Sequence, residues 1–210
     1  MIDLLNMRIA EELARRIFQL MKTNPIAAPR LGVDIGRVII HGDGPDTNFI
    51  GGSDADAMRA PAMDGVLEAL TRLSARFEGR VWIVSKCGPR IEARSRAWLD
   101  GHRFFETTGI PRQQIRFCRN RKDKAPICLD LGIDYFVDDR IDVLLPMMGI
   151  VAHRCLFGAA TSPEPGIIPA PTWAVAEAAI THILDEEESV GIREDVSHVS
   201  SRGTPAARAR

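Results

Sequence analysis

The sequence has few aromatic residues, no excess of charge of either sign and no long apolar run, and each absence excludes a class of function. Aromatic side chains make up 6% of the chain, too few for a surface that stacks nucleobases. The 27 basic and 28 acidic residues give a formal net charge of −1, so no overall positive field attracts nucleic acid or an anionic membrane. No apolar run approaches the roughly 20 residues that span a bilayer. We therefore expect neither a membrane protein nor a nucleic-acid-binding protein.

Cysteine is also scarce, and its spacing does not suggest a disulfide framework or a zinc module. The chain has four cysteines and no Cys-x-x-Cys pair. Scattered thiols of this kind are typical of a reduced protein, and we expect them to be half-buried. The N-terminal segment carries Asp3, Glu11 and Glu12 where a secretory signal would be apolar. The sequence therefore predicts a cytoplasmic protein.

The chain divides into one main domain and two terminal segments. Its 210 residues, 45% of them hydrophobic, suffice for one well-buried domain and not for two ordinary ones. Apolar residues spaced by three and four predict an amphipathic helix over 1–24, packed on the domain, with a partner-binding helix as the alternative. The domain itself covers 25–185 and includes an irregular, Gly- and Asp-rich flap at 41–60. Residues 186–210 are acidic, then Ser- and Arg-rich, and predict a disordered tail.

Short apolar strands alternate with helical patterns through the domain. We expect strands at 31–35, 81–84, 115–118, 135–137 and 150–157, and helices at 63–77, 91–99, 125–131 and 173–184. This alternation predicts an α/β protein with a Rossmann-like, doubly wound parallel sheet and helices on both faces. The interval between the first two strands also holds a helix, so the domain has a small cap or none.

Polar side chains stand where the predicted strands end. Asp34 follows the first strand, Ser85 the second, and the pair Asp138-Asp139 a later one, while Lys124 opens the helix before that pair. In an open α/β sheet, ligands bind beyond the carboxyl ends of the strands. A carboxylate can attack an electrophile, paired carboxylates can hold Mg²⁺, and a hydroxyl with an ammonium can hold an anion. Each residue alone also fits a turn or a helix cap, but together they predict a phosphoryl-transfer site.

Over residues 30–158 the sequence resembles the haloacid dehalogenase superfamily, most of whose members are Mg²⁺-dependent phosphatases. The resemblance is carried by Gly32–Val38, Val81–Ser85, Lys124 and Tyr135–Asp139. A further segment, 123–134, looks most similar to small, deoxyribonucleotidase-like members. The resemblance implies a small phosphorylated substrate, with nucleotides among the candidates.

The resemblance also assigns a role to each polar residue. It implies that Asp34 is the nucleophile and a metal ligand, and that Ser85 supplies the hydroxyl that binds the phosphate. Lys124 is expected to steady both the nucleophile and the phosphoryl oxygens. Asp138 and Asp139 are expected to hold Mg²⁺. The function implied is that of a phosphoric monoester hydrolase, which forms an aspartyl-phosphate at Asp34.

Gly36 departs from the family's pattern. Phosphatases of the family carry a second aspartate two residues after the nucleophile, which protonates the leaving oxygen and then activates water. The Gly36 carbonyl is still able to bind the metal, but loss of such an acid typically costs about 10²–10⁴-fold in rate. Three explanations stay open: a leaving group that needs no acid, a substitute from the flap, or a protein that binds phosphate without hydrolysing it. The flap offers His41, Asp43 and Asp46 as substitutes.

The alternative function is therefore a catalytically weakened phosphate- or nucleotide-binding protein. A dehalogenase is less favoured, because displacement of a halide needs no Mg²⁺ and would leave Asp138 and Asp139 without a purpose. Basic residues near the predicted strand ends are expected to be solvated, with a rim for an anionic substrate as the alternative; they are Arg90, Arg94, Arg96, Arg116, Arg119, Arg121 and Lys122. The sequence predicts neither the substrate nor the oligomeric state.

Overall fold

Six parallel strands form one sheet in the order β3-β2-β1-β4-β5-β6. The computed structural model describes residues 28–42, 50, 52–162 and 164–200, with side chains as far as residue 189. The strands are β1 (Leu31–Val33), β2 (Val81–Lys86), β3 (Ile115–Cys118), β4 (Tyr135–Asp138), β5 (His153–Phe157) and β6 (Ile167–Ala170). The predicted doubly wound, parallel α/β sheet is confirmed.

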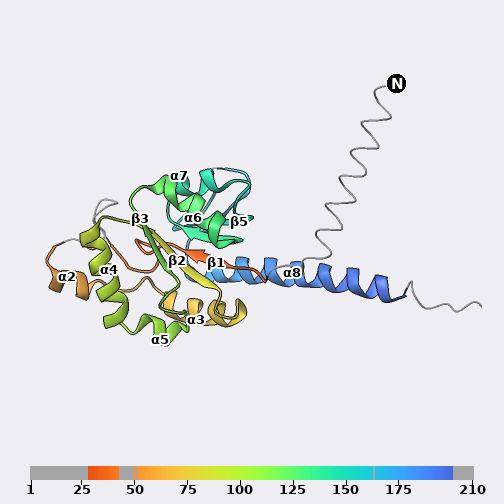
Figure 1. Ribbon diagram of the computed structural model, residues 1–210, viewed down its shortest axis with the longest axis horizontal. Coiled ribbons are helices and arrows are strands. Elements are labelled where there is room, and N and C mark those ends of the chain that lie inside the picture. Colours follow the sequence, from red (N-terminus) through yellow and green to blue (C-terminus); the bar gives the residue numbers. More distant parts are fainter. Residues whose placement is uncertain (1–27, 43–49, 51, 163, 201–210) are drawn as a thin grey trace, which may run out of the picture.

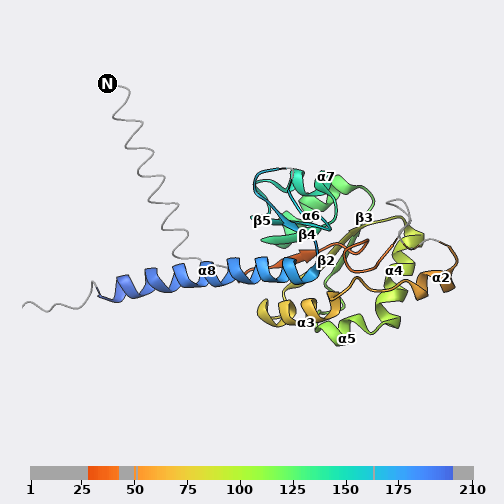
Figure 2. The ribbon, with the colours of Figure 1, turned by 180° about the vertical axis from the view of Figure 1, so that it is seen from behind.

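Helices cover both faces of this sheet (Figures 1 and 2). One layer consists of α3 (Val66–Arg76), α4 (Pro89–Gly101), α5 (Phe104–Thr108) and α8 (Trp173–Ser200), with α2 (Asp54–Arg59) against α4. The other layer holds α6 (Lys124–Leu131) and α7 (Ile141–Leu144), with the 3-10 turns η1 (Arg121–Asp123) and η2 (Leu145–Met147). No helix in the described part of the chain is both long enough and apolar enough to cross a membrane.

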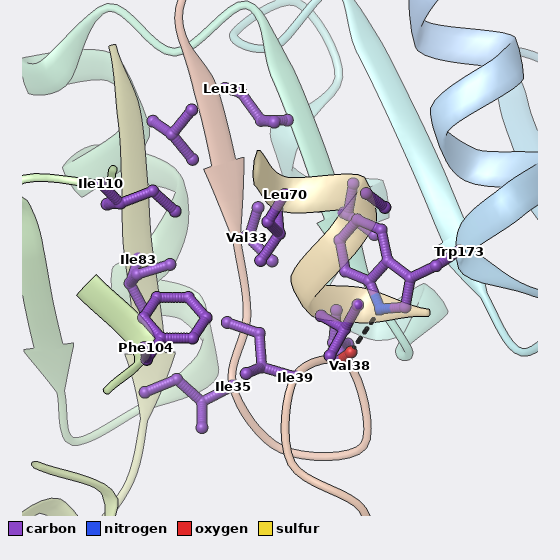
Figure 3. Close-up of a cluster of buried hydrophobic side chains, with 14 of the residues drawn as sticks. Leu31, Val33, Ile35, Val38, Ile39, Leu70, Ile83, Phe104, Ile110 and Trp173 are labelled. Atoms are coloured by element: carbon purple, nitrogen blue, oxygen red, sulfur yellow. Dashed lines mark hydrogen bonds between the residues drawn. The ribbon is translucent and has the colours of Figure 1, made fainter. Parts of the chain in front are cut away.

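The two layers enclose two hydrophobic cores. Leu31, Val33 and Ile83 face Leu70 of α3 and Trp173 of α8 in the larger core (Figure 3). Residues that alternate with them along the strands fill the second core beneath α6 and α7, which includes Val84, Phe136 and Val143. This alternation is the two-residue period of a strand that is buried on both faces.

Gly32 permits the closest approach inside the sheet. It pairs with Phe136 across β1 and β4, and both residues are buried. A Cβ atom on Gly32 would lie 2.4 Å from Cδ2 of the Phe136 ring. Glycine is therefore required here by packing rather than by backbone conformation.

The first turn of α8 is bonded to the loop that follows β1. The indole N–H of buried Trp173 donates to the carbonyl of Val38 at 2.7 Å (Figure 3). Further along α8, Asp185 and Glu188 form ion pairs with Arg76, the last residue of α3. Glu187 accepts from the Tyr135 hydroxyl at 2.7 Å.

The structure corrects the predicted tail and the predicted flap. Disorder was expected from residue 186, but α8 continues through Ser200. Its acidic residues Asp185 and Glu188 pair with Arg76 of α3, and Glu187 bonds to Tyr135 of β4. The described part of the flap contains α2, which Ser53 opens with a capping box to Asp56. Residues 1–24 and 201–210 lie outside the described part of the chain.

The remaining differences are local. Strand β6 and helix α5 were not predicted. All four cysteines are free and buried, whereas half-buried thiols were expected. None of these differences alters the strands that carry the site.

Candidate active site

The site lies where the strand order reverses. The chain proceeds from β1 to β2 and β3 on one side, and then places β4, β5 and β6 on the other side of β1. Asp34 directly follows β1, and its backbone N–H donates to the Val137 carbonyl of β4 at 3.0 Å. Asp138 ends β4, and Ser85 is the last residue but one of β2. The topology therefore brings these predicted residues to one edge of the sheet, at the usual ligand position of such folds.

Lys124 links two of the acids. It begins α6, only 2% of it is exposed, and its Nζ lies 2.7 Å from Asp138 Oδ2 and 2.9 Å from Asp34 Oδ1. Burial alone would lower the pKa of Lys124, but the negative charges of Asp138 and Asp34 and the hydrogen bond to Asp138 outweigh burial and raise it. The ammonium group is therefore a fixed positive charge at physiological pH.

Asp138 is completely buried. Its Oδ2 binds Lys124, and its Oδ1 accepts from the backbone N–H of Arg140 at 3.0 Å. Burial raises the pKa of Asp138, and so do the nearby charges of Asp34 and Asp139, although Lys124 opposes them. A further cation near Asp138 would therefore stabilise its carboxylate against burial and against the neighbouring acids.

Asp139 is held by Arg37, a residue that the sequence analysis did not single out. Nη2 of Arg37 lies 2.7 Å from Asp139 Oδ2. Burial and the charge of Asp34 raise the pKa of Asp139, and Arg37 opposes this shift. Arg37 has a left-handed backbone with φ of 59°, which is uncommon for a residue with a side chain. The pair is tertiary, so no spacing in the sequence could have revealed it.

The three acids form a donor set that suits a divalent cation. One carboxylate oxygen from each of Asp34, Asp138 and Asp139 lies within 4.8 Å of the others. Asp34 Oδ1 is buried and, although it lies near the Lys124 ammonium, it accepts no hydrogen bond of good geometry. Hard carboxylate oxygens and an unsatisfied buried acceptor fit Mg²⁺, the metal that the sequence analysis predicted.

A small pocket opens onto these acids. It is lined by Asp34, Gly36, Arg37, Ser85, Lys86, Arg121, Lys124, Asp139, Arg140 and Val143. Among the described residues no hydrogen bond engages the Ser85 hydroxyl, which leaves it available to an anion. Gly36 lines this pocket and is not among the described glycines with positive φ, so its backbone conformation is one that other residues also adopt.

The predicted substitutes for the missing acid are not brought to this pocket in the described structure. His41 is exposed and does not line the pocket. Asp43 and Asp46 lie outside the described residues.

The basic residues named from the sequence mostly have structural roles. Arg121 lines the pocket. Arg94 is buried and bonds to Asp54 and to the carbonyls of Ile50 and Gly52. The others lie elsewhere: Arg96 is placed over the Phe117 ring, Arg116 over the Trp82 ring, and Arg119 pairs with Glu92.

Two cysteines near the site, Cys87 and Cys118, are unsuited to be nucleophiles. Burial raises the pKa of Cys87 to about 12 and that of Cys118 to about 11. Both are therefore neutral thiols at physiological pH, and the thiolate is the reactive form. These two thiols are therefore not candidate nucleophiles.

Comparison with known proteins places the fold. A scan against protein-family models finds no match, and a search of the curated proteins finds none either. Among solved structures, the chain is similar to a haloacid dehalogenase-like family hydrolase from Xanthomonas campestris, with 13% identity and a TM-score of 0.50. That match covers 74% of this chain and 96% of the other. The fold of this chain is therefore that of a haloacid dehalogenase-like hydrolase.

A second solved structure is a D,D-heptose 1,7-bisphosphate phosphatase from Burkholderia thailandensis. It is 15% identical, the match covers 73% of this chain and 98% of the other, and the TM-score is 0.45.

Proposed function

We propose that this chain is a Mg²⁺-dependent hydrolase of small phosphomonoesters that works through an aspartyl-phosphate at Asp34. One observation carries the proposal. The buried Lys124 ammonium lies between Asp34 and Asp138 at the switch point of the sheet, in a pocket with the Ser85 hydroxyl and Asp139. This arrangement supplies a nucleophile, a fixed cation, an anion-binding hydroxyl and a metal-binding acid pair within one small volume.

Binding precedes chemistry. The Ser85 hydroxyl and the Lys124 ammonium hold oxygens of the phosphoryl group. The carboxylates of Asp34, Asp138 and Asp139, together with the Gly36 carbonyl, would hold Mg²⁺. When bound, the metal supplies positive charge that offsets both the crowded acids and the incoming phosphate.

The reaction then needs two displacements at phosphorus. A carboxylate oxygen of Asp34 bonds to phosphorus while the ester P–O bond breaks, and the released oxygen takes its proton from water. A water oxygen next attacks the same phosphorus, loses a proton, and frees inorganic phosphate and the Asp34 carboxylate. Because Gly36 provides no acid, we expect leaving groups of low pKa to react fastest.

The test replaces the nucleophile. Asp34→Asn keeps nearly the same shape, so phosphate release from p-nitrophenyl phosphate with Mg²⁺ should fall to background while the protein stays folded. Asp130→Asn, which changes an exposed acid on α6 outside the pocket, is the matched control and should keep wild-type turnover. Turnover of Asp34→Asn at the wild-type rate would contradict the proposal.

A second candidate function is phosphate binding without turnover. It is favoured by Gly36, which lines the pocket in place of an acid. If the missing acid limits the rate, p-nitrophenyl phosphate should be hydrolysed and glycerol 3-phosphate should be nearly inert, and Gly36→Asp should raise turnover of the alkyl ester. If neither ester is hydrolysed by the wild type or by folded Gly36→Asp, while a phosphorylated ligand binds, the binding function is the correct one.

A further inference from the structure

The pocket is lined by several cationic side chains, which come from different parts of the chain. Five of its lining side chains are cationic, from Arg37, Lys86, Arg121, Lys124 and Arg140. Two of the five pair with the three site acids: the Lys124 ammonium lies between Asp34 and Asp138, and Arg37 forms an ion pair with Asp139. The other three belong to different elements, and they meet at the same opening.

Lys86 is the most distinctive of these three. It ends β2, directly after Ser85, and is half-buried where it lines the pocket. Within the described part of the chain, no ion pair or hydrogen bond engages its ammonium group. A partly desolvated ammonium beside other cations is stabilised by an anion.

Arg121 and Arg140 reinforce this charge. Arg121 lies in η1 and Arg140 precedes α7, so they approach the pocket from two different segments. Nη1 of Arg121 lies 3.3 Å from Asp142, and Nε of Arg140 lies 2.8 Å from the same carboxylate. Partial burial raises the pKa of Asp142, but these arginines outweigh it and lower that pKa. One carboxylate thus bridges two guanidinium groups and holds them in place beside the pocket.

We propose that Lys86, with Arg121 and Arg140 beside it, is a second anion subsite, and that the preferred substrate is a phosphomonoester with a second anionic group. That group is a carboxylate or another phosphate. Lys86 forms an ion pair with this second group, while Ser85 and Lys124 bind the oxygens of the reacting phosphoryl group. The inference rests on the proposed function, since it concerns the far end of the same substrate.

Matched substrate pairs test the subsite. 3-Phosphoglycerate and glycerol 3-phosphate differ by a carboxylate, and fructose 1,6-bisphosphate and fructose 6-phosphate differ by a phosphate. The wild type should favour the more anionic member of at least one pair by about tenfold in kcat/KM, the range expected for one hydrogen bond to a charged group. The pair that shows the preference identifies the second anion.

Lys86→Met should reduce that preference by about tenfold. Lys122→Met is the matched control, because Lys122 is exposed and does not line the pocket, and it should keep the wild-type ratio. No preference in either pair would overturn the subsite. An equal loss on both members of a pair would also overturn it, because Lys86 would then serve the reacting phosphate.

A binding measurement separates this inference from the proposed function. Calorimetry on Asp34→Asn measures affinity for intact 3-phosphoglycerate and glycerol 3-phosphate, and for both fructose phosphates, without turnover. Tighter binding of the more anionic member, lost in the Asp34→Asn/Lys86→Met double variant, supports the subsite even if the wild type hydrolyses nothing. Equal affinity within both pairs refutes the subsite even if the wild type is an active phosphatase.

Discussion

Removal of the buried ammonium group should destabilise the fold, and the loss should depend on pH. In Lys124→Met, Asp138 would stay completely buried with the N–H of Arg140 as its remaining hydrogen-bond donor. Breaking a buried ion pair by removing one partner costs about 3–5 kcal/mol. The whole domain is expected to be stable by about 5–15 kcal/mol, so the variant should fold but unfold at clearly lower urea concentration.

The sign of the pH dependence follows from burial. Without Lys124, desolvation raises the pKa of folded Asp138 further above its value in the unfolded chain. A raised pKa means that the protonated form favours folding, and that this advantage is lost as the pH rises through the folded pKa. The difference in unfolding free energy between wild type and Lys124→Met should therefore be large at pH 8 and smaller at pH 5.

Urea denaturation without metal at both pH values is the assay. The double variant Lys124→Met/Asp138→Asn should be more stable than Lys124→Met at pH 8, because it no longer buries an unpaired charge. Lys122→Met, an exposed lysine, should change the free energy by less than about 0.5 kcal/mol. A loss below about 1 kcal/mol for Lys124→Met, or an equal loss at pH 5 and pH 8, would refute the reasoning.

Two further predictions concern packing and metal binding. Gly32→Ala should lose about 1–3 kcal/mol in urea denaturation, because the new methyl group would meet the buried Phe136 ring; unchanged stability would show that this ring shifts freely. Arg37→Ala should bind Mg²⁺ more tightly in calorimetry and show a larger rise in melting temperature with the metal, because Asp139 is no longer shared with a guanidinium group. An unchanged or weaker affinity would show that Arg37 does not compete with the metal.

The strands that carry the site could be predicted because a strand buried on both faces is a continuous run of apolar residues in the sequence. Continuous apolar runs end at Asp34 and just before Ser85 and Asp138, and the sheet brings those ends together. Lys124 was named from its position at the start of a predicted helix, and its Nζ lies 2.7 Å from Asp138 and 2.9 Å from Asp34. The roles of these residues in catalysis stay predictions.

Other features depend on tertiary contacts that no local pattern records. Strand β6 contains Pro169, which argues against a strand, yet at the edge of a sheet one row of N–H groups needs no partner. The acidic residues of α8 were interpreted as a solvated tail, although Glu187 and Glu188 have partners on distant segments. Helix α2 does have a local signal, the Ser53–Asp56 capping box, which the surrounding glycines and aspartates obscured.

The bond between Trp173 and Val38 sets the length of the smallest fragment that can keep the site intact. The last strand ends at Ala170, and the nearest convenient truncation point in the sequence follows it. A chain cut there would lose the indole donor and leave the Val38 carbonyl, in the loop just after Asp34, without its partner. The loop next to Asp34 would also lose the large buried surface of the Trp173 ring. For expression or for grafting onto another protein, the functional unit therefore ends within α8, beyond the last strand of the sheet.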